Sequence, residues 1–95
     1  MPTFGWDPEK ARRNRAKHGI TFELATRVWD DPLHVILPDR FEGGEQRWHA
    51  IGVVGSGSLL VVVHVYYGQE SAQVRIIGAR KATSHERRRY EEQGL

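Results

Sequence analysis

The sequence predicts an α+β fold in which two N-terminal helices and a C-terminal helix pack on an antiparallel sheet. Two observations support this. Between residues 47 and 79, three β-type runs are separated by short stretches that contain glycine, a pattern typical of antiparallel hairpins. Capped helical patterns precede and follow that region. A chain of 95 residues without a linker or repeat is expected to form a single domain spanning residues 1–95.

The N-terminal region predicts a short strand and then a polar helix. Residues 3–6 are mostly apolar and favour the strand. Asp7-Pro8 begins the helix, because Asp is a good N-cap and Pro is tolerated at the first helical position. Gly19 offers a left-handed stop after His18. Asn14, four residues before His18, is expected to hydrogen-bond to it and fix one tautomer.

A second helix is expected from the N-cap Thr21 to Trp29, because its apolar residues recur with helical spacing. Asp31-Pro32 ends it. Residues 33–37 then predict a strand, and residues 38–46, with their charges and paired glycines, predict a mobile loop at a hairpin tip.

Three further strands are expected at residues 47–54, 59–67 and 73–79. The run 59–67 is apolar at nearly every position, which places it in the middle of the sheet with both faces covered. Thr83 and Glu86 fit the capping box that begins a helix. The expected order is therefore β-α-α-β-β-β-β-α.

Composition limits the function classes. No apolar run approaches the roughly 20 residues that cross a bilayer, and the N-terminal residues lack a signal-peptide pattern. A cytoplasmic location without membrane contact is expected. The absence of cysteine excludes disulfides. The net charge is only +2, but the cations cluster at residues 10–17 and 75–89, and such clusters favour a polyanionic partner.

Cofactor motifs are missing from the sequence. It contains no P-loop, no dinucleotide fingerprint and no metal-binding histidine spacing, so neither a cofactor nor a metal is expected. His64 lies in the most apolar strand and is interpreted as a core residue.

RNA cleavage without a metal requires cations for the phosphate and groups that move protons. Arg80 and Lys81 lie where the last strand ends, and Arg75 lies within it. The alternative for Arg80 and Lys81 is a solvated pair that closes the strand, and Arg75 has the same structural alternative. Tyr90 is a candidate for base stacking or proton transfer, or else the apolar anchor of its helix. Glu86 is explained by the capping box and is left out of the site.

Other basic residues also have both a functional and a structural explanation. Lys17 and His18 end the first helix, where the helix dipole favours cations in any protein. Of the run Arg87-Arg88-Arg89, at most two side chains can address one ligand, since three consecutive helical residues point in three directions.

The chain resembles the BrnT family of bacterial type II toxins. The resemblance rests on blocks that span nearly the whole sequence: Trp6, Asp7 and Lys10; Asn14, Lys17, His18, Gly19, Ile20 and Phe22; Asp31 and Pro32; Arg47, Ile51 and Gly52; and the segment from Arg75 to Tyr90. It implies a RelE-like fold and a ribonuclease that arrests translation. It also implies a BrnA-type antitoxin with a ribbon-helix-helix domain, through which the complex contacts operator DNA and represses its own operon.

The working hypothesis is a metal-independent endoribonuclease. In it, Arg80 and Arg75 stabilise charge on the phosphorus, His18 transfers a proton, and Tyr90 stacks or assists. Lys17, Lys81, Arg87 and Arg88 bind RNA. The alternative is a non-catalytic module that binds nucleic acid or the antitoxin.

Overall fold

The computed structural model describes residues 2–55, 57–68 and 73–93. Its elements follow the expected order and are β1 (Thr3–Gly5), α1 (Pro8–His18), α2 (Phe22–Ala25), the 3₁₀ helix η1 (Thr26–Asp30), β2 (Val35–Glu42), β3 (Glu45–Val54), β4 (Ser58–Tyr66), β5 (Gln73–Lys81) and α3 (Ser84–Glu91). The second N-terminal helix is thus a single α-helical turn that tightens into a 3₁₀ helix.

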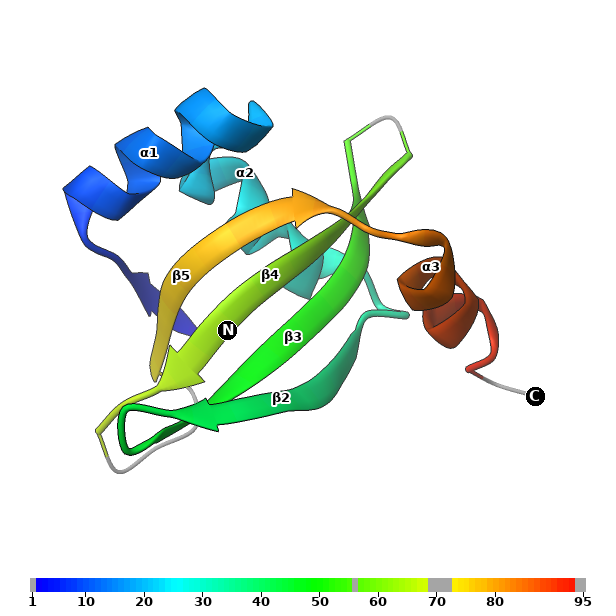
Figure 1. The fold of residues 1–95 in the computed structure, drawn as a ribbon. Coiled ribbons are helices and arrows are strands. Elements are labelled where there is room, and N and C mark those ends of the chain that lie inside the picture. Colours follow the sequence, from blue (N-terminus) through cyan, green and yellow to red (C-terminus); the bar gives the residue numbers. More distant parts are fainter. Residues whose placement is uncertain (1, 56, 69–72, 94–95) are drawn as a thin grey trace.

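The five strands form one sheet in the order β1-β5-β4-β3-β2 (Figure 1). β4 is central, as its apolar composition predicts. The pairs β2–β3, β3–β4 and β4–β5 are antiparallel. β1 instead runs parallel to β5. The helices carry the chain from β1 at one edge of the sheet to β2 at the other edge, and the antiparallel strands then bring it back to β5 beside β1. The sheet is therefore mixed, and the α+β class is confirmed.

The region 38–46 differs from the expected loop. β2 continues to Glu42 and β3 begins at Glu45, so only Gly43 and Gly44 form the connection. Both glycines have positive φ, 62° and 80°. A two-residue hairpin turn with positive φ at both positions matches the natural twist of the strands, and glycine adopts it without steric cost. The paired glycines therefore make a tight turn between two long strands.

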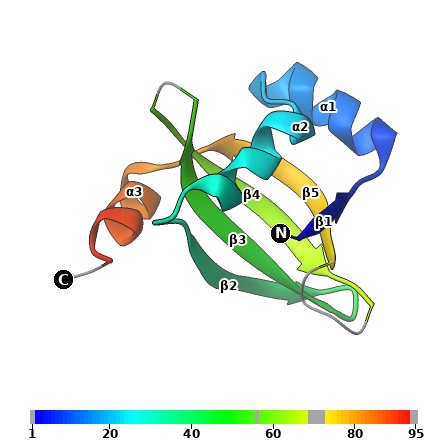
Figure 2. The ribbon, with the colours of Figure 1, turned by 180° about the vertical axis from the view of Figure 1, so that it is seen from behind.

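One face of the sheet is covered by α2 and η1 (Figure 2). The main core lies between them and the sheet, where Phe22, Ala25 and Val28 are fully buried. The helical layer approaches β3 closely at Gly52, where an added Cβ would lie only 2.9 Å from Val28 Cγ1. Gly52 is thus required by packing, since nearly any side chain would push η1 off the sheet.

α1 lies along the edge of the sheet beside β5 and is fixed there by Asn14. The Asn14 side chain accepts a hydrogen bond from Ala79 N (3.1 Å) and donates to Ala79 O (2.9 Å) and Ile20 O (3.0 Å). Among the described residues, the expected hydrogen bond between Asn14 and His18 is not formed, because the Asn14 amide bonds the backbone of β5 instead. Asn14 therefore hydrogen-bonds the backbone of β5 at Ala79, beyond the part of β5 that pairs with β1.

α3 packs on the opposite face, at one end of the sheet. Its capping box between Thr83 and Glu86 is present as expected. Tyr90 packs against a small second core built on Ile51, Leu59 and Val61. Its hydroxyl donates a 2.6 Å hydrogen bond to Asp31 Oδ2.

Among the described residues, no helix is both long and apolar enough to cross a membrane.

Candidate nucleic-acid interface and active site

The face of the sheet opposite α2 is left open between α1 and α3. Three neighbouring hollows lie on it. The central one, about 410 Å³, is lined by Asp39, Arg40, Arg47, His49, Val63, Ile77, Gly78 and Arg80. It shares Arg47 and Ile77 with a hollow of about 470 Å³ under α1, and it shares His49 with one of about 350 Å³ beside α3. The shared residues join them into one band across the sheet, which we call the open-face groove.

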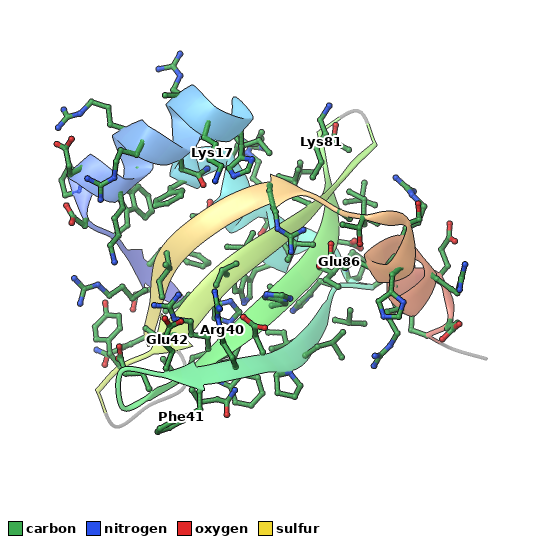
Figure 3. The ribbon with its side chains drawn as sticks, viewed as in Figure 1. Lys17, Arg40, Phe41, Glu42, Lys81 and Glu86 are labelled. Carbon is green, nitrogen blue, oxygen red and sulfur yellow. The ribbon has the colours of Figure 1, made fainter. Side chains whose placement is uncertain are left out.

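Figure 3 looks onto this face, with Lys17 on α1 at one side and Glu86 at the start of α3 at the other. The α1 end of the open-face groove is strongly basic: its lining includes Lys10, Arg13, Lys17, His18 and Arg47. Carboxylates gather only toward its centre and its α3 end. The groove therefore offers a cationic approach that leads to a mixed cluster of charged groups.

At the centre, Arg80 and Glu86 form a bidentate ion pair. Arg80 Nη1 donates to Glu86 Oε1 at 2.7 Å, and Arg80 Nη2 donates to Glu86 Oε2 at 2.8 Å. The Glu86 side chain is only 15% exposed. The hydrogen bonds from Arg80 lower the pKa of Glu86 to about 2 and raise the pKa of Arg80. Both groups therefore stay charged at neutral pH.

His49 lies between two carboxylates. Its Nε2 is 3.2 Å from Asp39 Oδ2, and its Nδ1 is 4.0 Å from Glu86 Oε2. We call Asp39, His49, Arg80 and Glu86 the Arg80 cluster. It combines a fixed guanidinium, which suits a phosphate, with an imidazole, the side chain that most readily exchanges protons near neutral pH. A carboxylate beside an imidazole orients the ring.

The sequence-predicted residues divide between this face and other places. Arg80 lies in the central hollow, and Lys17 and His18 line the α1 end of the same groove. Arg75 lies five residues before Arg80 on β5 and lines a separate hollow with Trp6 and Tyr67. The structure thus brings Arg80, Lys17 and His18 to one groove and places Arg75 beyond its end.

The remaining candidates do not line the hollows of the open-face groove as the structure describes them. Lys81, Arg87 and Arg88 are exposed at the end of β5 and on α3. Tyr90 is anchored in the second core by its bond to Asp31. Burial and then that bond raise the pKa of Tyr90 to about 12, which keeps the hydroxyl protonated. Tyr90 has the surroundings of a structural anchor, the alternative that sequence reasoning had left open.

Sequence reasoning missed Asp39, His49, Arg47 and Glu86. The capping box explained Glu86 so well that its second role was hidden. For Arg47 and His49 a signal existed: they are two residues apart on a strand, so their side chains share a face. Asp39 was placed in a loop, and a loop position gives no facing direction.

His64 is fully buried, as a core residue should be. Burial lowers the pKa of His64 to about 4, so the ring is neutral. Its Nδ1 lies 3.0 Å from Val62 O. Among the residues that the structure describes, no three His, Asp or Glu side chains converge in a way that could hold a metal ion.

Comparison with known proteins identifies the family. The model of the ribonuclease toxin BrnT, of type II toxin-antitoxin systems, matches residues 6–86. Among solved structures, the chain resembles the Brucella abortus ribonuclease toxin BrnT, with a TM-score of 0.63 and 24% sequence identity over 88% of this chain and 100% of that one. No curated protein sequence matches. The family match covers most of the chain, and the fold agrees with it. This chain therefore belongs to the BrnT family of ribonuclease toxins of type II toxin-antitoxin systems.

Proposed function

We propose that this chain is a metal-independent endoribonuclease that folds as one domain over residues 1–95 and cuts RNA at the Arg80 cluster. The observation that carries the proposal is the contact of His49 with two carboxylates, one of which holds Arg80, at the centre of the open-face groove. Phosphate recognition and proton transfer are then available within one hollow. The family's ribonuclease description supports the same reaction.

The proposed reaction uses the 2′-hydroxyl of RNA as the nucleophile. His49 accepts the hydroxyl proton, and Asp39 orients the ring. The 2′-oxygen bonds to phosphorus, the bond from phosphorus to the 5′-oxygen breaks, and that oxygen takes a proton from solvent. Arg80 stabilises the negative charge that builds on the phosphate oxygens. The products are a 2′,3′-cyclic phosphate and a free 5′-hydroxyl.

The basic residues of α1 supply binding in this proposal. Lys10, Arg13 and Lys17 hold phosphates that flank the cleaved one, as Lys and Arg do in most nucleic-acid complexes. His18 lies with them and is assigned to the same role. Proton transfer is assigned to His49 instead of His18, because His49 contacts the carboxylate that holds Arg80.

The test is cleavage of RNA by the purified, partner-free protein in EDTA. Wild type is expected to cleave. Arg80→Ala and His49→Gln are expected to reduce the rate at least a hundredfold, the scale on which removing an electrostatic or proton-transfer group acts. Arg12→Ala, an exposed arginine on α1 outside the lining of the groove, is the matched control. Full activity in Arg80→Ala, with its fold retained, would contradict the assignment.

A second candidate is a non-catalytic module that binds nucleic acid. The observation in its favour is that Glu86 occupies two donors of Arg80, so a phosphate must compete with a carboxylate for this guanidinium. This candidate predicts that RNA is bound but remains intact, and that expression without a partner does not arrest growth.

The proposed partner is a BrnA-type antitoxin with a ribbon-helix-helix domain, acting with the toxin in the cytoplasm. Membership of a type II toxin family supports an antitoxin. In this proposal the antitoxin makes the contacts to operator DNA. Adding the purified antitoxin should suppress RNA cleavage, and continued cleavage within a formed complex would contradict its role.

A further inference from the structure

A fourth hollow lies beyond the α1 end of the open-face groove and has a different character. It measures about 290 Å³ and is lined by Gly5, Trp6, Tyr67 and Arg75. These residues come from β1 and the position after it, from β5 and from just after β4, three strands that are adjacent in the sheet (Figure 1). Two aromatic rings and one guanidinium therefore meet at a site to which the proposed reaction assigns no role.

Local packing keeps this hollow open and its walls in place. An added Cβ at Gly5 would lie 3.3 Å from Tyr67 Oη, so glycine leaves room for the phenol. Trp6 contacts the fully buried Phe22 edge to face, with ring centroids 5.8 Å apart, which fixes the indole. Tyr67 is 42% exposed, although large aromatic side chains are usually buried. Part of its ring is therefore available to a ligand.

Arg75, one wall of this hollow, lies on the face that carries the Arg80 cluster. Arg75 is opposite Val65 on β4, and Arg80 is opposite Val61. Val61 and Val65 are four residues apart on one strand, so their side chains share a face. Four strand residues span roughly 13 Å. A strand of RNA lying along the groove would therefore reach this hollow a few nucleotides away from the cleaved phosphate.

We propose that this hollow is a subsite for one nucleobase of the RNA substrate, which stacks on Tyr67 and Trp6 while Arg75 contacts the base or its phosphate. The inference rests on the proposed ribonuclease function and adds a base-binding site to it. Aromatic and guanidinium planes are the surfaces on which proteins stack unpaired bases. The volume falls just below the roughly 300 Å³ at which pockets for drug-sized ligands begin, which suits a single base.

The charge around the hollow favours a base over an apolar side chain of a protein. Arg75 forms part of its wall, and the neighbouring hollow under α1 contains Lys10 and Arg13 in its lining. A nucleotide brings a phosphate to such surroundings, whereas an apolar side chain would leave these cations without an anion.

The experiment compares two cleavage-resistant ligands. One is a 2′-O-methyl RNA octamer, and the other is the same backbone without bases. Tyr67→Ala should weaken binding of the octamer about tenfold, the effect of losing one stacked base, and should leave binding of the abasic backbone unchanged. Tyr67→Phe, which keeps the ring, should restore most of the affinity. Phe41→Ala is the matched control, because Phe41 is an aromatic residue, 68% exposed, on β2 at the opposite edge of the sheet and outside the lining of the hollow.

The outcomes separate this inference from the ribonuclease proposal. Equal octamer affinity in wild type and Tyr67→Ala would overturn the base subsite, and so would equal losses for both ligands. If Tyr67→Ala instead weakens only antitoxin binding, the hollow holds a protein side chain and the inference also fails. Cleavage of unmodified RNA by wild type is measured alongside, and its absence would remove the ribonuclease proposal itself.

Discussion

The carboxylate of Glu86 belongs to a helix cap and to an ion pair at once. It accepts a hydrogen bond from Thr83 N at 2.8 Å, which satisfies a free amide at the start of α3. The same oxygen, Oε1, also accepts from Arg80 Nη1, and Oε2 accepts from Arg80 Nη2. The position of Arg80 in the groove is therefore coupled to the start of α3, and a change at Glu86 affects both.

Stability should depend on pH through Glu86. Its pKa is about 2 in the folded protein, below the ordinary value of 4.5. The ionised carboxylate therefore adds stability in full above about pH 4.5, and this contribution is lost as the pH falls through about 2. It is at most on the order of 3 kcal/mol. Urea unfolding from pH 7 to pH 2 should show a smaller decrease in Glu86→Gln than in wild type. Parallel pH profiles would contradict this.

Tyr90 permits a test of its role as an anchor. Tyr90→Phe removes the hydroxyl that bonds Asp31 and should lower the free energy of unfolding by about 1–2 kcal/mol. The rate of RNA cleavage should not change, because Tyr90 does not line the open-face groove in the described structure. Thermal unfolding and a cleavage assay on the same preparation measure both. A stable but inactive variant would return Tyr90 to the catalytic site.

At the scale of elements, α1 depends on Asn14 for its attachment to the sheet. Asn14→Ala removes three hydrogen bonds and leaves the buried amide of Ala79 unpaired, which should cost roughly 2–3 kcal/mol. Arg12→Ala on the exposed side of the same helix should change stability by less than about 0.5 kcal/mol. Chemical denaturation of the two variants compares them. Equal small losses would show that apolar contacts hold α1 in place.

The elements were predictable wherever local chemistry decides them. Asp7, Thr21 and Thr83 cap helices where their sequence patterns placed them. The prediction at residues 38–46 was wrong because charged residues also occur on exposed strands, and Gly43-Gly44 needs only two residues to reverse the chain. The parallel pairing of β1 is a long-range contact, and local patterns carry little information about such contacts.

The site was less predictable than the fold, for a physical reason. Arg80 could be proposed because a cation at the end of a strand is visible in the sequence. His49 and Asp39 matter only through their contact, and the register of β2 against β3, which pairs His49 with Leu37, cannot be read from either strand alone. A side chain such as Glu86 that already has a local explanation also gives no sign of a second partner.

At the scale of the whole molecule, the net charge of +2 understates the attraction for RNA, because cations gather at one end of the groove. Binding of a single strand should weaken with salt, with a slope of about −0.7 in log affinity per phosphate contact. Lys17→Ala should make the slope less steep by about 0.7, and Arg12→Ala should leave it unchanged. Titrations of the 2′-O-methyl octamer at several salt concentrations test this. Equal slopes would remove Lys17 from the interface.

The Arg80 cluster takes one member from each of β2, β3, β5 and α3, and Glu86 is the last of them along the chain. Synthesis on the ribosome proceeds from the N-terminus, so the basic helix α1 emerges early while the cluster is still incomplete. Until α3 has left the exit tunnel, the nascent chain can attract RNA but lacks the carboxylate that positions Arg80. The order of translation therefore completes the proposed cleavage site only after α3 has emerged.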